Sequence, residues 1–121
     1  MADIIYFAGR DQPASVLLVE RDPVARTAVA AYLRESGLSV IEAVNSTETL
    51  QLLRAGRPIS VIFGTLEPAP VAAIQHEFPR VKLLLGHDGE APVSLHGLPI
   101  VRRPYNLHEV ERATKALMRR R

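Results

Sequence analysis

The chain has 121 residues, of which 47% are hydrophobic and 23% charged, and its formal net charge is +2. A domain of this size can bury enough surface to fold alone, and this composition excludes a wholly disordered chain. The absence of cysteine excludes disulfides, thiolate metal ligands and cysteine nucleophiles. No apolar run approaches the roughly 20 residues that cross a bilayer, and no signal peptide is visible, so we expect a cytoplasmic protein with no membrane contact.

The charge is distributed unevenly along the chain. Residues 1–100 hold 8 Lys/Arg and 11 Asp/Glu, a sum of −3, whereas residues 101–121 hold 7 and 2, a sum of +5. A basic C-terminal end can meet nucleic acid or an acidic partner. It can equally be a helix whose last turn complements the helix dipole, and the sequence favours that simpler interpretation.

Short apolar strand patterns alternate with helical patterns from residue 16 onward. The first expected elements are a strand over 16–19, a helix between Asp22 and Gly37, a strand over 38–43, and a helix that Asn45 or Ser46 caps and Gly56 ends. They are followed by a strand over 59–63 that Gly64 stops, a short helix over 71–78, a strand over 81–85, a strand over 99–101 and a final helix that starts at Asn106. The stretch 86–97 holds three glycines and one proline, so it predicts mostly loop.

This alternation favours a parallel sheet with helices on both faces. The flavodoxin-like version, an α/β/α arrangement of three layers with strand order 2-1-3-4-5, suits five strands and places sites at the carboxyl ends of the strands. We expect one domain over 16–121. An N-terminal arm or extra strand over 1–15 precedes it, and its apolar run 4–8 could add to a sheet edge of its own domain or of a second subunit.

Four stretches of the chain resemble the receiver domain of bacterial response regulators, the CheY-like domain of two-component signalling. They are VLLVERDP at 16–23, LSVIEA at 38–43, ISVIFGTLEP at 59–68 and RRPYNLHE at 102–109. They stand in the family's order: the first strand with its acidic cluster, the second βα unit, the third strand with its proline loop, and the Lys-Pro-aromatic stretch. The resemblance implies a flavodoxin-like fold and a role in phosphorelay signalling.

The positions that carry the family's chemistry hold other residues here. Gly64 stands at the phosphorylated aspartate, and glycine offers no carboxylate nucleophile. Glu20 and Arg21, followed by Asp22, stand at the acidic pair that binds Mg²⁺, where an arginine removes an oxygen ligand and adds a positive charge. We therefore expect no tight metal site. Arg21 could instead be an internal counter-ion, paired with Glu20, Asp22 or Glu67.

The resemblance implies further changes around the last two strands. The family's Ser/Thr after the fourth strand falls on Gly86 or His87, and its aromatic switch position falls on Ile100. Arg103 matches the family lysine, and Pro104 follows it, so the bond between them is a candidate for the cis form. The family's fourth helix is expected to be reduced or missing.

These changes together predict a degenerate receiver that keeps the fold without the chemistry. It would act in two-component signalling by protein–protein interaction that is independent of phosphorylation, with no enzymatic activity, no cofactor and no metal. Its partner would be a signalling kinase, a phosphotransferase or a second copy of the chain, so a homodimer stays open. The candidate partner face consists of Tyr105, His108, Arg112 and Lys115.

Two other functions compete with this one. A flavodoxin-like domain can be an enzyme or bind a small molecule at its strand ends, but the sequence has no glycine-rich phosphate loop, no Gly-x-Ser-x-Gly and no paired metal histidines. The basic C-terminal helix can bind nucleic acid phosphates. Few aromatic residues interleave with its arginines and no helix-turn-helix follows it, so the sequence favours a protein partner over nucleic acid.

Overall fold

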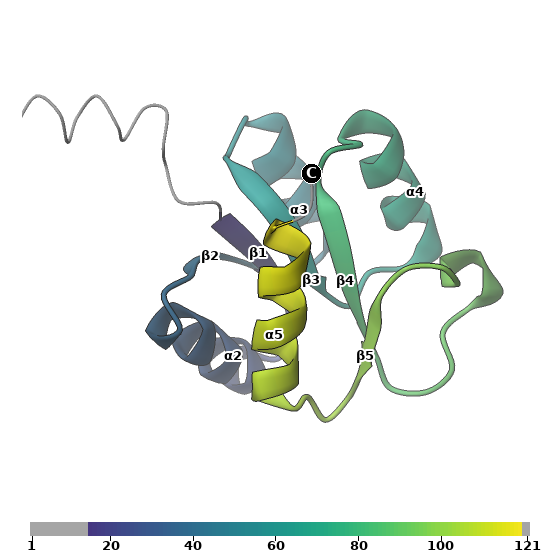
Figure 1. The fold of residues 1–121 in the computed structure, drawn as a ribbon. Helices are drawn as coiled ribbons and strands as arrows, with labels where there is room; N and C mark the ends of the chain where they lie inside the picture. The colour runs from purple at the N-terminus through teal and green to yellow at the C-terminus, as the bar shows by residue number, and fades with distance from the viewer. Residues whose placement is uncertain (1–14, 120–121) are drawn as a thin grey trace, which may run out of the picture.

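The computed structural model describes residues 15–119, and within this range the elements follow the predicted alternation (Figure 1). They are β1 (Ser15–Val19), α2 (Pro23–Glu35), β2 (Ser39–Ala43), α3 (Ser46–Arg54), β3 (Ile59–Gly64), α4 (Pro68–Glu77), β4 (Lys82–His87), the 3₁₀ turn η1 (Val93–Leu95), β5 (Ile100–Arg102) and α5 (Leu107–Met118). The predicted N-terminal arm lies outside the described residues except for Ser15, which belongs to β1 and pairs with Ser39.

The five strands form one parallel sheet in the order β2-β1-β3-β4-β5. Helices α2 and α5 cover one face of this sheet, and α3 and α4 cover the other (Figure 1). The predicted flavodoxin-like arrangement of three layers is therefore confirmed. None of the helices within residues 15–119 is long and apolar enough to cross a membrane.

Continuous apolar strands explain why both faces of the sheet are covered. Leu18, Phe63 and Leu84 point toward α2 and α5, whereas Leu17 and Ile62 point toward α3 and α4. All five are at most 1% exposed. A parallel strand buried on both faces needs this kind of uninterrupted apolar run. The packed sheet holds the carboxyl ends of its strands together at one edge.

Side chains at the helix starts set the directions in which the chain leaves that edge. Asp22 caps α2, accepting hydrogen bonds from the backbone N–H groups of Val24 and Ala25. Asn45 caps α3 and Asn106 caps α5 in the same way. Each such cap contributes about 1 kcal/mol of helix stability by satisfying N–H groups that have no partner within the helix.

The connection between β4 and β5 departs most from a regular βαβ unit. The helix that the receiver family has here is reduced, as predicted, to the single turn η1, whose Leu95 is buried. The predicted start of the preceding loop at Gly86 is wrong, because β4 continues through His87 and both residues pair with β5. The helix predicted over 71–78 starts earlier, at Pro68, since proline is well tolerated in the first helical turn.

Candidate functional site

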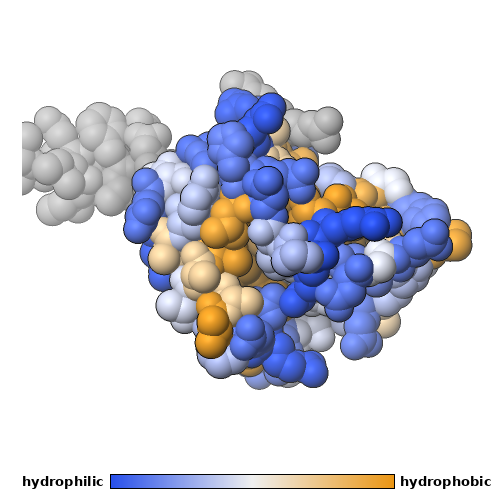
Figure 2. Space-filling model, turned by 90° about the horizontal axis from the view of Figure 1, so that it is seen from below, coloured by the Kyte–Doolittle hydropathy of each residue, from blue (hydrophilic) through white to orange (hydrophobic). Residues whose placement is uncertain are grey.

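The carboxyl ends of the strands surround a hollow of about 450 Å³. Figure 2 views the molecule from this edge of the sheet, which lies at the bottom of Figure 1. The loops after β1, β2, β3, β4 and β5 all contribute side chains to its wall. This is the edge at which ligands and catalytic groups lie in open α/β sheets.

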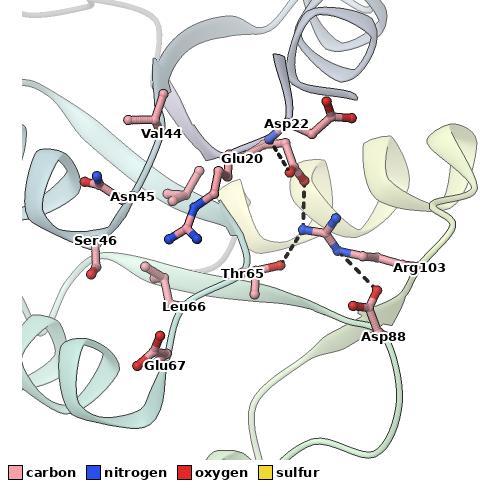
Figure 3. A pocket seen from close by; sticks show the side chains of 12 residues that line it. Glu20, Asp22, Val44, Asn45, Ser46, Thr65, Leu66, Glu67, Asp88 and Arg103 are labelled. Atoms are coloured by element: carbon pink, nitrogen blue, oxygen red, sulfur yellow. Dashed lines mark hydrogen bonds and ion pairs between the residues drawn. The ribbon is translucent and has the colours of Figure 1, made fainter. Parts of the chain in front are cut away.

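Arg103 reaches into this hollow from the loop after β5 (Figure 3). Its Nη2 atom lies 2.8 Å from Oε1 of Glu20 and donates a hydrogen bond of 2.7 Å to the hydroxyl of Thr65. Its Nε atom lies 3.6 Å from a carboxylate oxygen of Asp88. The Glu20 side chain is only 3% exposed, so the guanidinium neutralises a carboxylate that is almost entirely removed from water. We call Glu20, Thr65, Asp88 and Arg103 the Arg103 cluster.

Backbone contacts fix Glu20 from the other side. Its Oε2 atom accepts a hydrogen bond of 3.0 Å from the backbone N–H of Asp22, and its carbonyl oxygen accepts one of 2.9 Å from Arg26. The carboxylate therefore has a fixed position, with one oxygen directed to the backbone and the other to Arg103.

The prediction that Arg21 would be the internal counter-ion is wrong. Arg21 is exposed and makes no ion pair within residues 15–119, although it lines the hollow. Consecutive residues at the end of a strand point in opposite directions, so Arg21 cannot follow the Glu20 side chain inward. The cation comes instead from Arg103, which is distant in sequence. Asp22, beside Arg21, uses its carboxylate to cap α2.

The backbone of β1 closes the position that matches the phosphorylated aspartate. A Cβ atom added to Gly64 would overlap the carbonyl oxygen of Val19 and lie 2.8 Å from its carbonyl carbon. Gly64 also has a φ of +151°, a conformation that favours glycine. No side chain, aspartate included, fits at this position unless β1 and β3 move apart.

An aromatic side chain fills the space at the end of β4. A Cβ atom added to Gly86 would overlap the hydroxyl group of Tyr105. The Tyr105 ring packs edge-on against Phe63, with 4.9 Å between ring centroids, and the guanidinium carbon of Arg103 lies 5.3 Å from the Tyr105 centroid. Burial raises the pKa of Tyr105 above its usual value of 10.0. Tyr105 thus occupies the volume that the family's hydroxyl residue would need.

Thr65 is a site residue that sequence analysis did not single out. Its hydroxyl accepts the hydrogen bond from Arg103 and donates one of 3.2 Å to the carbonyl oxygen of Gly86. The backbone N–H of Arg103 also donates to the carbonyl oxygen of His87 over 2.9 Å. These bonds join the ends of β3, β4 and β5. Nothing in the local sequence around Thr65 signals them, because its partners lie 21 and 38 residues away.

The structure separates the residues of the predicted partner face. Tyr105 is turned inward against Phe63, whereas His108 and Arg112 are exposed on α5. Lys115 lies on the same side of α5 and makes an ion pair of 2.9 Å with Glu111. This pair, through its hydrogen bond, lowers the pKa of Glu111.

Two further predicted positions, Ile100 and Pro104, lie in β5 and shortly after it. Ile100 is half-buried in β5, where it pairs with Leu85. The bond between Arg103 and Pro104 is cis, as predicted.

The residues at this edge do not fit the magnesium site that the resemblance implies. Mg²⁺ prefers oxygen ligands in near-octahedral geometry. Gly64 supplies no oxygen ligand from a side chain, Arg21 adds positive charge, and the carboxylate of Glu20 is already paired with Arg103. Within residues 15–119, no three His, Cys, Asp or Glu side chains are grouped so that they could hold a metal ion.

Comparison with known proteins identifies the fold. No family model and no curated protein sequence matches the chain. A response regulator from Thermotoga maritima superposes with a TM-score of 0.76 at 20% identity, covering 88% of this chain and 98% of that one. The signal receiver domain of an HD domain-containing protein from Pseudomonas fluorescens superposes with a TM-score of 0.76 at 18% identity, covering 88% of each chain.

A third solved structure shows a complex of the histidine kinase ThkA with the response regulator protein TrrA. The matched chain superposes with a TM-score of 0.76 at 19% identity, covering 86% of this chain and 97% of that one. The chain therefore has the fold of response-regulator receiver domains, and the resemblance found in the sequence is confirmed at the level of the fold.

Proposed function

We propose that this chain is a receiver-like module of two-component signal transduction that binds a protein partner without being phosphorylated. It is cytoplasmic and has no enzymatic activity of its own. The observation that carries the proposal is the closed backbone at Gly64, where the carbonyl group of Val19 occupies the space of any side chain. Without a carboxylate at this point, the domain has no acceptor for a phosphoryl group.

The charges at the site support the same proposal. Phosphoryl transfer needs cations that are free to neutralise the transferred group. In the Arg103 cluster the guanidinium already pairs with Glu20 and Asp88 and donates to Thr65. The cation that matches the family lysine is thus committed within the domain. Because these charges are already paired within the domain, we expect the domain to keep the same surface toward its partner with or without a phosphate donor.

The partner class follows from the fold and from the charge of α5. One structural neighbour is a response regulator in complex with a histidine kinase, and a kinase, a phosphotransferase or a second copy fits this module. His108, Arg112 and Lys115 are spaced by four and three residues and so lie on one side of α5. We assign the partner contact to this side of α5, where the exposed Arg112 makes no ion pair within residues 15–119 and suits an acidic surface on the partner. His108 and Lys115, in contrast, both lie beside Glu111.

Incubation with acetyl phosphate and Mg²⁺, followed by intact-mass measurement, tests the lack of phosphorylation. The expected result is an unmodified mass and no heat of Mg²⁺ binding by calorimetry. A receiver domain with its aspartate intact serves as the positive control. A stoichiometric, Mg²⁺-dependent gain of an acid-labile phosphoryl group would contradict the proposal.

The contact on α5 is tested by comparing two charge reversals in affinity capture from cells of the source organism. Arg112→Glu reverses a charge on the proposed face, and Arg57→Glu reverses an equally exposed charge in the loop after α3. The proposal expects a signalling protein to be lost with Arg112→Glu and retained with Arg57→Glu. Equal capture by both variants removes the assignment to α5.

A small-molecule function is the second candidate, and one feature of the hollow favours it. Arg21 lines the hollow and makes no ion pair within residues 15–119, and Ser46 at the start of α3 lines the same hollow. A free guanidinium of this kind suits an anionic ligand. A thermal-shift screen against nucleotides, flavins and small carboxylates tests it. A ligand whose stabilisation disappears in Arg21→Ala would favour this function over the protein-binding one.

A further inference from the structure

The exposed side of α2 is free of charge along most of its length. Val24, Ala28 and Ala31 are all exposed and are spaced by four and three residues, so they form one stripe on the helix. Val24 is 76% exposed, which is unusual for a large apolar side chain in this domain. The opposite side of α2 is buried in the core. The helix therefore has a second apolar face that nothing in residues 15–119 covers.

The stripe extends to a charge of opposite sign at each end. Within α2, Val24, Ala28, Ala31 and Glu35 are all exposed and are separated by four, three and four residues, and Arg21 is exposed just before Asp22, the N-cap of this helix. This is the spacing of a seam between two packed helices. Arg21 and Glu35 make no ion pair within residues 15–119. The seam thus carries an unpaired cation at its start and an unpaired carboxylate at its end.

A hollow of about 510 Å³ lies beside the stripe, between α2 and the start of α5. Ala25, Ala28, Val29 and Leu107 give it an apolar wall, and the rest of its lining comes from Asp88 and the loop Arg103–Tyr105. Figure 2 shows this apolar surface left of centre, between areas of polar side chains. The face is therefore both apolar and incompletely packed, as expected of a surface that receives another helix.

We propose that this face of α2 packs against the same face of a second copy of the chain, with the two α2 helices antiparallel. A twofold axis near Ala28 brings Arg21 of each copy opposite Glu35 of the other, which gives two equivalent ion pairs. A parallel arrangement would instead place like charges together and align the two helix dipoles. A twofold axis requires a self-complementary surface, and a seam with opposite charges at its two ends has this property.

Small side chains at the middle of the seam permit the close approach that this packing needs. Ala28 of one copy meets Ala28 of the other at the axis, and Val24 packs beside Ala31 of the second copy. In the single copy Arg21 lines the hollow at the strand ends, so in the dimer its exposed side chain swings out of this hollow to reach Glu35 of the second copy. One helix from each copy makes a small interface, so the dimer is weak and forms at high local concentration.

Sedimentation velocity over a concentration series tests this packing. The wild-type chain is expected to change from monomer to dimer, and Ala28→Arg to raise the dissociation constant at least about tenfold, since two guanidinium groups would then meet at the axis. Ala116→Arg places the same side chain on the exposed side of α5 and should leave the dimer unchanged. Both alanines are exposed, so circular dichroism should show the same fold in both variants.

A charge exchange tests the antiparallel orientation. Arg21→Glu and Glu35→Arg should each weaken the dimer, and the double variant should restore it, because the two ion pairs re-form with reversed sign. EDTA is present throughout, since Arg21→Glu adds a carboxylate next to Glu20. A chain that stays monomeric at about 1 mM, where even a contact of about −4 kcal/mol would be visible, overturns the proposal.

Two further results also overturn it: a dimer that Ala28→Arg leaves intact, and a double variant no stronger than the single ones. These experiments measure only the oligomeric state, so the dimer proposal can fail while the proposed lack of phosphorylation holds, and the reverse.

Discussion

The interior of the sheet keeps the residues expected of a parallel sheet, whereas its carboxyl edge lacks residues expected of a receiver domain. In the interior, side chains such as Leu17, Leu18 and Ile62 are fully buried between two layers of helices, as in any parallel sheet. At the edge, Gly64, Gly86 and Arg21 all depart from what receiver chemistry needs. The fold thus depends on the residues of the interior, and the proposed loss of receiver chemistry concerns a separate set of residues at the edge.

Although the edge surrounds a hollow, the space next to Gly64 and the space next to Gly86 are both filled. The backbone of Val19 fills the space at Gly64, and the ring of Tyr105 fills the space at Gly86. Arg103 supplies the positive charge that a metal ion would bring to Glu20. Arg103 contacts both Glu20 and the Tyr105 ring, so reversing one of these replacements should disturb the edge while leaving the interior intact.

Gly64→Asp is expected to have the largest effect. The new Cβ atom would overlap the carbonyl oxygen of Val19, and aspartate is strained at a φ of +151°. Overpacking and backbone strain together predict a loss of about 2–5 kcal/mol in the free energy of unfolding, measured with urea. The variant should also remain unphosphorylated, because the strands must separate before a carboxylate fits.

Gly89→Asp is the matched control for this substitution. Gly89 has open space around its Cβ position and no positive φ, so the change should have little effect on unfolding. A Gly64→Asp variant as stable as Gly89→Asp would show that the end of β3 is not closed by β1. The contrast between edge and interior would then lose its main support.

Arg103→Ala is expected to have the next largest effect. Removing the guanidinium leaves the carboxylate of Glu20 buried without a counter-ion, and the cost should be about 2–3 kcal/mol because Arg103 itself is 28% exposed. Arg102→Ala, at an exposed neighbouring position with no ion pair within residues 15–119, should cost little. Adding Glu20→Gln to Arg103→Ala should recover part of the loss in a double-mutant cycle. Independent, additive losses would contradict the ion pair.

The interior was predictable from sequence because its signals are local. The runs over 16–19 and 59–63, the cap at Asp22 and the helix stop at Gly37 each act within a few residues of the chain, and the structure shows a strand, helix start or helix end at each. The reduced helix before β5 was predicted for the same reason, since glycines and Pro92 disfavour a helix there.

The edge was predictable only in part, because its contacts join residues far apart in sequence. The missing acceptor at Gly64 and the arginine at 103 are visible in the sequence, but the pairing of Arg103 with Glu20 is not. The sequence instead suggests Arg21 as the counter-ion, because Glu20 and Asp22 are its neighbours and Glu67 follows the third strand, whereas the alternation of side chains at a strand end directs Arg21 away from Glu20. The role of Thr65 depends on the ends of β3, β4 and β5 lying side by side, and no local sequence pattern around Thr65 predicts that.

Gly86→Ser, which restores a hydroxyl at the end of β4, should have a moderate effect. Its Cβ atom would overlap the Tyr105 hydroxyl, but that atom is the end of a movable side chain, so the ring can swing away from Phe63. The expected loss is about 1–2 kcal/mol in the free energy of unfolding. Combining it with Tyr105→Leu should cost less than the sum of the single changes. Strict additivity would show that Tyr105 does not fill this space.

Asp22→Ala should have the smallest effect on the free energy of unfolding. It tests whether the Asp22 carboxylate serves to start α2 or to bind a ligand at the edge of the sheet. Asp22 lies within the family's acidic cluster, yet its side chain accepts hydrogen bonds from Val24 and Ala25 at the start of α2. A cap of this kind is worth about 1 kcal/mol, and Asp22→Ser should retain most of it because serine also caps well. A charged group serving a ligand site would instead lose its role in both variants. Equal stabilities of Asp22→Ser and wild type, measured by urea unfolding, would therefore show that Asp22 serves to start α2, even though it lies at the edge where the receiver family has its acidic cluster.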